Sequence, residues 1–163
     1  MHPGNTRDED AVDETGAAPT PPVTWRPRNI RMVAYGLAGL LFVTMAVLAL
    51  ILPADWKFQD RVGLLLLGVL SVGVLHLLAR PRVTATDEGV TIVNSIRTHV
   101  LVWPEIVDVR MPVGEPWPSV DLADGSTLAV MGIQSNDGDR AQQNLAALRA
   151  LLRERGEAAE PGH

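Results

Sequence analysis

The chain has no cysteine, a single lysine and few aromatic residues. Without cysteine it can form no disulfide, no thiolate nucleophile and no cysteine-ligated zinc site. Nearly all of its 14 basic residues are arginines, and 19 acidic residues give a formal net charge of −5. A nucleic-acid binder needs a basic face that displaces counterions from phosphates, so this charge balance argues against that class of function.

Motifs that carry chemistry are also missing. The sequence contains no G-x-x-x-x-G-K-[ST] loop, no H-E-x-x-H and no pairing of a nucleophile with a base. Residues 136–139 (NDGD) resemble part of a calcium loop, but the later bidentate glutamate is absent and helix capping explains the run better. We therefore expect no catalytic, cofactor-binding or metal-binding residues.

Two long apolar runs dominate the first half of the chain. Residues 32–52 carry no charge and would span roughly 30 Å as a helix, the thickness of a hydrocarbon core. Residues 62–79 form a second run. A signal peptide would be shorter and would stand nearer the N-terminus, and soluble core helices would show a polar stripe. The sequence predicts transmembrane helices over residues 30–52 and 62–79, joined by a short extracytoplasmic loop over residues 53–61.

Flanking charges predict how this hairpin lies in the cell membrane. The connecting loop holds Lys57 and Arg61, whereas five arginines lie on the side of the termini: Arg26, Arg28, Arg31, Arg80 and Arg82. Basic residues favour the cytoplasmic side, so both termini are expected to be cytoplasmic. Trp25 and Trp56, near helix ends, are expected at the headgroup level.

Small residues in both runs predict close helix packing. They are Ala34, Gly36, Ala38 and Gly39 in the first run, and Gly63, Gly68, Ser71 and Gly73 in the second. His76 is the one ionisable residue inside a span, and such groups are functional candidates by default. Because it lies near the basic end, we favour a structural role in which it reaches the interface or bonds the other helix.

The flanks of the chain differ from the region behind the hairpin. Residues 1–29 are acidic and rich in proline, and we expect them to be disordered, as we do residues 156–163. Residues 80–155 instead alternate with a period of two, which predicts six antiparallel strands. One turn is formed by Asp87, Glu88 and Gly89, with the glycine left-handed, and another by Asp124 and Gly125.

An amphipathic helix is expected to close this module over residues 138–155. Leu145, Leu148 and Leu152 would lie on its buried face, and Asn136, Asp137 or Asp139 would cap its start. Trp103 and Ile106 are expected to anchor a sharp corner between two strands, with Glu105 on the surface or capping the corner.

These motifs resemble the bacterial pleckstrin-homology-like (PH-like) family, and within it the subgroup named after the low-molecular-weight protein antigen 6 of actinobacteria. The resemblance rests on T-x-x-G-V (Thr86, Gly89, Val90), on W-x-E-I within residues 100–109, and on Asp124, Gly125 and Leu128. It covers residues 81–155, about half of the chain. Actinobacterial members often carry two membrane spans ahead of the domain. The resemblance implies a small antiparallel β-barrel or sandwich capped by a C-terminal α-helix. A full barrel of this type has seven strands, and residues 112–118 are where the seventh is in question.

The expected function is that of a non-enzymatic binding or scaffolding module at the cytoplasmic face of the membrane. Membrane lipids would surround the two helices, and a protein would be the partner of the domain. An alternative is a sensor of lipid headgroups, and another is an accessory subunit of a membrane transporter or envelope enzyme. In eukaryotic relatives, Lys and Arg of the first hairpin hold phosphoinositides. Here that turn holds Asp87 and Glu88, which would repel a phosphate, so Arg97 and His99 are left as the binding candidates.

Overall fold

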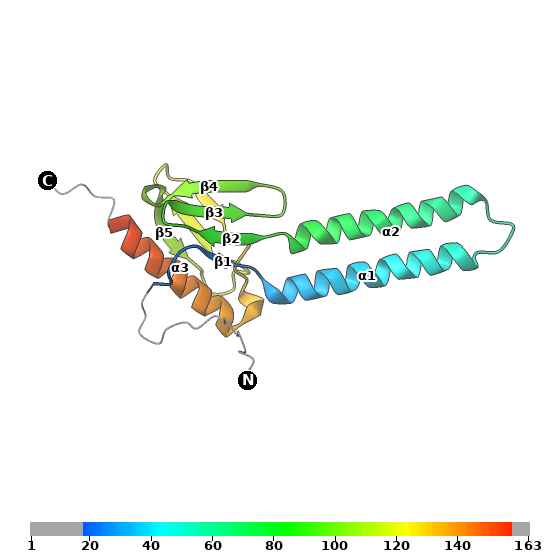
Figure 1. Cartoon of the computed structure of the whole chain (residues 1–163), viewed down its shortest axis with the longest axis horizontal. Helices are drawn as coiled ribbons and strands as arrows, with labels where there is room; N and C mark the ends of the chain where they lie inside the picture. Colours follow the sequence, from blue (N-terminus) through cyan, green and yellow to red (C-terminus); the bar gives the residue numbers. More distant parts are fainter. Residues whose placement is uncertain (1–17, 158–163) are drawn as a thin grey trace, which may run out of the picture.

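A computed structural model of the chain describes residues 18–157, and it consists of a helical hairpin that projects from a β-sandwich (Figure 1). The disorder expected for residues 1–17 and 158–163 lies outside the described residues. Sheets, hairpin and closing helix match the fold expected from the sequence, a membrane-type α-hairpin followed by a PH-like β unit.

The hairpin consists of α1 (Arg28–Ile51) and α2 (Phe58–Ala79). Both helices are long and apolar enough to cross a membrane, with about 33–36 Å of helix each. They pack on each other through small side chains: Ala34 and Ala38 are buried, and a Cβ on Gly68 would come within 3.3 Å of Met45 and Phe42. Gly36 and Gly39 have open space around the Cβ position, so they do not contribute to this packing.

The sandwich has two antiparallel sheets and is not closed into a barrel. One sheet has the order β1-β2-β3-β4 and the other has the order β5-β6-β7. The strands are β1 (Val23–Trp25), β2 (Arg82–Ala85), β3 (Gly89–Val93), β4 (Thr98–Val102), β5 (Ile106–Arg110), β6 (Ser119–Leu122) and β7 (Thr127–Ala129).

The seventh strand corrects the sequence prediction. Residues 112–118 form a loop, and the extra strand is β1, which lies ahead of the hairpin in a segment expected to be disordered. β1 pairs with β2, with Trp25 opposite Val83. Trp25 is only 7% exposed and belongs to the core, so its indole packs against protein and is not exposed for the headgroup contact that the sequence suggested. The first hairpin of the sheet is therefore β1–β2, and the helical hairpin is inserted into it.

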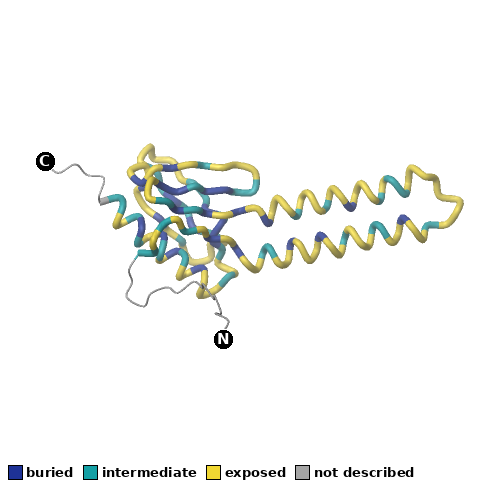
Figure 2. Tube along the Cα trace, in the orientation of Figure 1, coloured by how far each residue is buried: buried dark blue, intermediate teal, exposed yellow. Residues whose placement is uncertain are grey.

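A closing helix, α3 (Asp139–Glu157), covers one end of the sandwich (Figures 1 and 2). Leu145 and Leu148 are buried as expected, together with Ala141 and Leu151, but Leu152 is only partly buried. At about 100° per residue, Leu152 lies within the face marked by Ala141, Leu145 and Leu148, and Leu151 lies at its side, so helical spacing alone does not predict which of the two leucines is buried. α3 also extends to residue 157, past the predicted end.

The corner at Trp103–Glu105 is a 3-10 helix, η1, and it is built as the sequence suggested. Trp103 and Ile106 are buried, and the Trp103 indole N–H donates to the Thr86 carbonyl at 3.1 Å. The Glu105 carboxylate accepts the Val102 N–H at 2.9 Å, so Glu105 caps the corner. These contacts make the corner part of the scaffold.

Candidate functional site

The junction between the hairpin and the sandwich is short and tightly held. Only Arg26 and Pro27 separate β1 from α1, and only Arg80 and Pro81 separate α2 from β2. Both prolines are buried. Since β1 and β2 are hydrogen-bonded neighbours, the two helices leave the same edge region of one sheet, and the direction of the hairpin is fixed by the domain.

Asp137 adds a second connection at this junction. It lies in η2 (Ser135–Asp137), and its carboxylate accepts the backbone N–H groups of Arg28 and Asn29, both at 3.0 Å. The Asn29 side-chain amide also donates to the Asn136 carbonyl at 2.8 Å. From the sequence, Asp137 is one of three candidate caps for the start of the C-terminal helix, with Asn136 and Asp139 as the others. Instead it caps α1, where a negative charge favourably meets the positive end of the helix dipole.

The opposite end of α1 is held by a positive charge. The Arg61 guanidinium, from α2, donates to the carbonyls of Ala49 and Leu52 at 2.7 Å each. These carbonyls have no partner within their own helix, and a cation suits the negative end of the dipole. Near the domain end, the Tyr35 hydroxyl and His76 Nδ1 lie 3.2 Å apart across the two helices. His76 thus bonds the other helix, as its structural interpretation predicted.

Beside the junction lies a hollow of about 480 Å³ with four arginines in its wall. Arg26, Arg28 and Arg31 come from the β1–α1 connection and the first turn of α1, and Arg140 comes from the start of α3. Met32 and Tyr35 complete its apolar side. We call this feature the arginine hollow. No acidic residue is among the described residues that line it.

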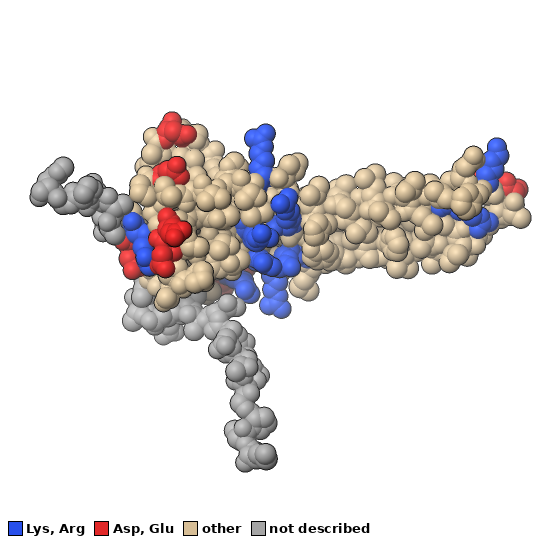
Figure 3. Space-filling view, turned by 45° about the horizontal axis from the view of Figure 1, so that its top comes forward, with Lys and Arg blue, Asp and Glu red and all other residues tan. Residues whose placement is uncertain are grey.

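Charges in the described structure are separated along the long axis of the molecule. Figure 3 shows a band of Lys and Arg where the hairpin meets the domain, and most Asp and Glu at the far end of the domain, where some basic side chains also lie. The tip of the hairpin carries both signs. The far end includes the β2–β3 turn with Asp87 and Glu88, η1 with Glu105, and the β6–β7 turn with Asp124. The described structure therefore has a basic end, at the base of the hairpin, although the net charge of the chain is negative.

Arg97 and His99, the binding candidates from the sequence, belong to this basic end but not to the arginine hollow. Arg97 is exposed in the β3–β4 turn, which is closed by the Asn94 N–H donating to the Arg97 carbonyl at 2.8 Å. This turn also contacts the hairpin, because the Arg80 guanidinium lies 3.4 Å from the Ser95 carbonyl. His99 is half-buried on β4. A binding role for these two residues stays a prediction.

Sequence reasoning missed the arginine hollow. It interpreted Arg26, Arg28 and Arg31 only as topology signals, and it gave Arg140 no role. The fold brings Arg140 next to a segment more than one hundred positions away, as the Arg28–Asp137 bond also shows. The single local signal was the density of arginines within residues 26–31.

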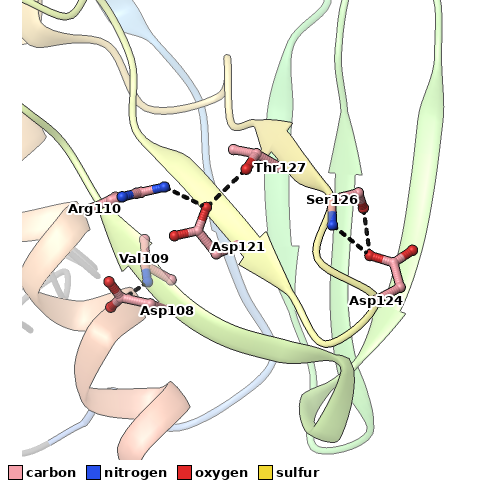
Figure 4. A network of polar contacts seen from close by, with 7 residues as sticks. All are labelled: Asp108, Val109, Arg110, Asp121, Asp124, Ser126 and Thr127. Carbon is pink, nitrogen blue, oxygen red and sulfur yellow. Dashed lines mark hydrogen bonds and ion pairs between the residues drawn. The ribbon is translucent and has the colours of Figure 1, made fainter.

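Carboxylates on the second sheet form a different kind of cluster (Figure 4). Asp121 accepts from the Arg110 guanidinium and the Thr127 hydroxyl, both at 2.9 Å. Asp124 accepts from the Ser126 hydroxyl and backbone N–H, and these hydrogen bonds hold the pKa of Asp124 below its ordinary value. Within residues 18–157 no group of three potential metal ligands occurs. These hydrogen bonds of Asp121 and Asp124 are those of a cross-strand pair and a turn.

A third surface is apolar. Val100 and Val102 project from the outer face of β4 and are 75% and 48% exposed. β4 is the last strand of its sheet, so it has a ladder partner on one side only. Exposed apolar residues on an edge strand form a surface suited to contact with another protein.

Comparison with known proteins supports the domain assignment. The family model described as bacterial PH domain matches residues 80–151. Two curated relatives, the uncharacterized protein Rv1417 of Mycobacterium tuberculosis and the uncharacterized protein Mb1452 of Mycobacterium bovis, are each 32% identical over 135 residues. The match covers 80% of this chain and 88% of each relative. No solved structure matches significantly.

The extent of these matches is informative. The part of the chain from residue 80 onward is only about half of the sequence. A match over 80% of the chain must therefore include much of the helical hairpin. The family model, by contrast, begins after β1, although β1 is a strand of the same sheet.

Proposed function

Because this chain belongs to the bacterial PH domain family, we propose that it is an integral membrane protein whose PH-like domain is a non-enzymatic binding module at the cytoplasmic face. PH-like domains are typically binding modules rather than enzymes. The helical hairpin supplies attachment to the bilayer. The domain would then be free to recruit a protein partner.

Exposure of the hairpin supports membrane insertion. Only 17% of the apolar window of α1 and 11% of that of α2 is buried, so most of their leucine and valine side chains face outward (Figure 2). A soluble protein rarely exposes a continuous apolar surface of this extent, and core helices of a soluble domain would be covered. The hydrocarbon core of a bilayer is the environment that fits these side chains.

The direction of insertion follows from the basic end of the domain. Arginines surround the base of the hairpin, where they would meet phosphate headgroups of the inner leaflet, whereas the tip carries Lys57 and Arg61. Basic residues favour the cytoplasmic side. We infer that the domain and both termini are cytoplasmic.

The observation that carries the binding role is the fixed attachment of the domain. With β1–β2 pairing, buried prolines and the Asp137 cap at the junction, the sandwich cannot rotate freely on the membrane. It presents the outer face of β4 in one orientation, with Val100 and Val102 exposed. Such a constant presentation suits a scaffold, because a partner meets a preorganised surface.

Site-specific cross-linking tests this function. A photo-reactive amino acid at Val100 in the full chain should give a discrete protein adduct in native membranes. The matched control is Val113, a fully exposed residue in the β5–β6 loop, which should give none. A charged substitution, Val102→Asp, should abolish the Val100 adduct.

The same experiment separates the alternative roles. If a probe at Leu66 on the outer surface of α2 gives the adduct and Val100 gives none, the chain is an accessory subunit that contacts its partner through the hairpin. If neither probe gives an adduct, or if Val100 and Val113 give the same adducts, a protein-binding role for β4 is wrong.

A further inference from the structure

The outer edge of β4 carries backbone groups that the described part of the fold leaves without a partner. Residue pairs of an antiparallel ladder alternate in their hydrogen bonding, and the bond from the Asn94 N–H to the Arg97 carbonyl sets the phase for β3 and β4. Thr98 and Val100 therefore direct their N–H and C=O groups away from β3. Within residues 18–157, no hydrogen bond reaches these outward groups. We call them the open edge.

The far end of the open edge is closed by Glu105. Val102 follows Thr98 and Val100 in the same series, and its outward N–H donates to the Glu105 carboxylate at 2.9 Å. This bond agrees with the phase of the ladder. The open edge is therefore limited to the half of β4 that lies nearest to the base of the hairpin.

The other sheet edges in the described structure are covered or short. In β5, the Asp108 carboxylate accepts the outward Val109 N–H at 2.8 Å, and the Arg149 guanidinium of α3 donates to the Val109 carbonyl at 2.7 Å. In β7, the Ala129 carbonyl accepts from the Asn94 side-chain amide at 2.9 Å. β1 has only three residues. The edge of β4 thus differs from the edges that the fold itself protects.

β4 also lacks the devices that usually keep an edge strand from pairing. Natural edge strands carry lysine, proline or a bulge for this purpose. β4 has the sequence THVLV and a regular register with β3 over five residue pairs. The side chains on its outer face, Thr98, Val100 and Val102, are uncharged, β-branched and exposed. Such an edge is a template for one more strand.

We propose that the open edge binds an extended segment of another membrane protein, the segment that leads directly into one of its transmembrane helices. This inference rests on the proposed function, because it names the kind of partner that the β4 surface would bind. Figure 1 shows β4 running along the same axis as the helical hairpin. β4 starts at the β3–β4 turn, where Arg80 contacts Ser95 at the base of the hairpin, and it ends at η1. An antiparallel strand on its edge would therefore run toward the bilayer.

The strand β1 is a precedent for this arrangement within the same sheet. β1 pairs antiparallel with β2, runs toward the hairpin and is followed after two residues by α1. Strands lie about 4.8 Å apart, so a strand added to β4 would lie roughly 14 Å from β2. A helix that follows this strand would enter the bilayer close to α2. The open edge thus fits a partner that is itself anchored in the membrane.

A second copy of this chain does not fit the open edge through its own β4. Antiparallel pairing of two β4 strands would direct the two hairpins in opposite directions, and one bilayer could not hold both. Parallel pairing about a two-fold axis would place identical backbone groups at the same height, so donors would face donors and no ladder would form. The partner strand therefore comes from a different sequence.

The outer face of the sheet indicates which side chains the partner strand would carry. Thr24, Thr84, Thr91 and Val100 lie opposite one another across the four strands. This row consists of β-branched residues, and cross-strand pairs of such residues stabilise a sheet. We expect a β-branched or aromatic residue opposite Val100, and no proline where the partner must donate to the open edge.

A proline at residue 98 tests the ladder separately from the side chains. The Thr98 N–H points away from β3, and proline is tolerated as the first residue of a strand, so Thr98→Pro should still fold. The conservative variant Thr98→Val keeps the N–H and the branched shape. With the photo-reactive residue at Val100 of the full chain in native membranes, Thr98→Val should retain the adduct. Thr98→Pro should lower its yield roughly fivefold, the effect of one lost ladder hydrogen bond.

Two further measurements identify the occupant and guard against misfolding. Mass spectrometry of the adduct should locate the linked residue on the cytoplasmic side of the partner, within about ten residues ahead of a transmembrane helix. If Thr98→Pro does not fold, hydrogen exchange is compared between the purified adduct and the free chain. The Thr98 amide should exchange at least tenfold more slowly in the adduct, and the exposed Val113 amide should not change.

Several results would overturn the inference. Equal adduct yields in Thr98→Pro and Thr98→Val, or an unchanged exchange rate at Thr98, would show contact through side chains alone and leave the proposed function intact. A link to a soluble protein, to a second copy or to residues 1–17 of the same chain would identify a different occupant. Absence of any Val100 adduct in the parent chain would instead defeat the proposed function itself.

Discussion

Two glycines in this domain are required for different physical reasons. Gly125 has φ +84°, the left-handed conformation that the Asp124–Gly125 turn was expected to need. Gly89 was expected to be left-handed as well, but it is the first residue of β3 and does not have positive φ. A Cβ there would lie 2.0 Å from the Leu101 carbonyl oxygen. Gly89 is needed for close approach between β3 and β4.

Alanine substitution should distinguish the two cases. Gly125→Ala should cost about 1–2 kcal/mol of unfolding free energy, the usual penalty for a left-handed non-glycine residue. Gly89→Ala should cost more, roughly 3 kcal/mol, because the contact is with backbone and one of the strands must move. Denaturant unfolding followed by tryptophan fluorescence measures both. Equal losses, or a larger loss for Gly125→Ala, would contradict this assignment.

The Asp137 side chain makes one of the contacts that hold the hairpin on the domain. Asp137→Ala removes an acceptor for the Arg28 and Asn29 amides and should cost about 1–2 kcal/mol. Hydrogen exchange at these two amides should become faster. The control Glu115→Ala removes the same charge from an exposed loop and should change neither quantity. Unchanged exchange at residues 28 and 29 in Asp137→Ala would mean that the cap contributes little.

At the scale of elements, the strand β1 belongs to the folded domain although it precedes the helical hairpin in the sequence. β1 contributes Trp25 to the core and covers one edge of β2. A fragment that begins at residue 80, where the family model begins, lacks both. It should therefore expose Val83 and its neighbours and have an unpaired β2 edge, which favours aggregation.

An excised domain tests this role of β1. Because Trp25 faces Val83, Arg26 can be joined to Arg82 by an Asn-Gly turn in place of residues 27–81. We expect this protein to be soluble and folded in water, with buried tryptophan fluorescence. The fragment 80–157 should be unstable or aggregated, and Trp25→Ala in the excised domain should cost about 3–5 kcal/mol. A fragment 80–157 as stable as the excised domain would show that β1 is dispensable.

β1 also marks the limit of sequence reasoning for this fold. The long helices and most of the strands were predictable because their signal is local: an uncharged run, an alternation of residues, an Asp-Gly turn. β1 has only three residues, and its partner β2 lies beyond the whole hairpin. Pairing over such a separation leaves no periodic pattern, and the surrounding proline and threonine residues indicate disorder instead.

The candidate site was less predictable than the fold for the same reason. Arg26, Arg28 and Arg31 are close in sequence, but Arg140 joins them only through the packing of η2 and α3 against the start of α1. The choice of Arg97 and His99 depended on assigning Asp87 and Glu88 to the first hairpin. Once β1 is recognised, that turn is the second hairpin, and the first one contains the helices.

At the scale of the whole molecule, the separation of charge connects the fold to its place in the cell. The basic end surrounds the base of the hairpin and the acidic turns lie at the far end of the domain (Figure 3). With the basic end at a negatively charged inner leaflet, each arginine near the surface would contribute about 1 kcal/mol of attraction, and the acidic end would be directed away from the same lipids. Attraction of the arginines and repulsion of the acidic turns would both favour the orientation in which the basic end faces the inner leaflet.

Cysteine labelling can test the membrane topology of the hairpin without background labelling, because the chain has no cysteine of its own. A single cysteine is placed at Asp55, in the loop at the tip of the hairpin, or at Glu88, in the far turn of the domain. A membrane-impermeant maleimide added to sealed cells should label Asp55→Cys and leave Glu88→Cys unlabelled. After permeabilisation both should react, since both positions are exposed. Labelling of Glu88→Cys in sealed cells, with protection of Asp55→Cys, would place the domain outside and reverse the orientation. Labelling of both in sealed cells would mean that the hairpin does not cross the bilayer, and the arginines at its base would then have no inner leaflet to meet.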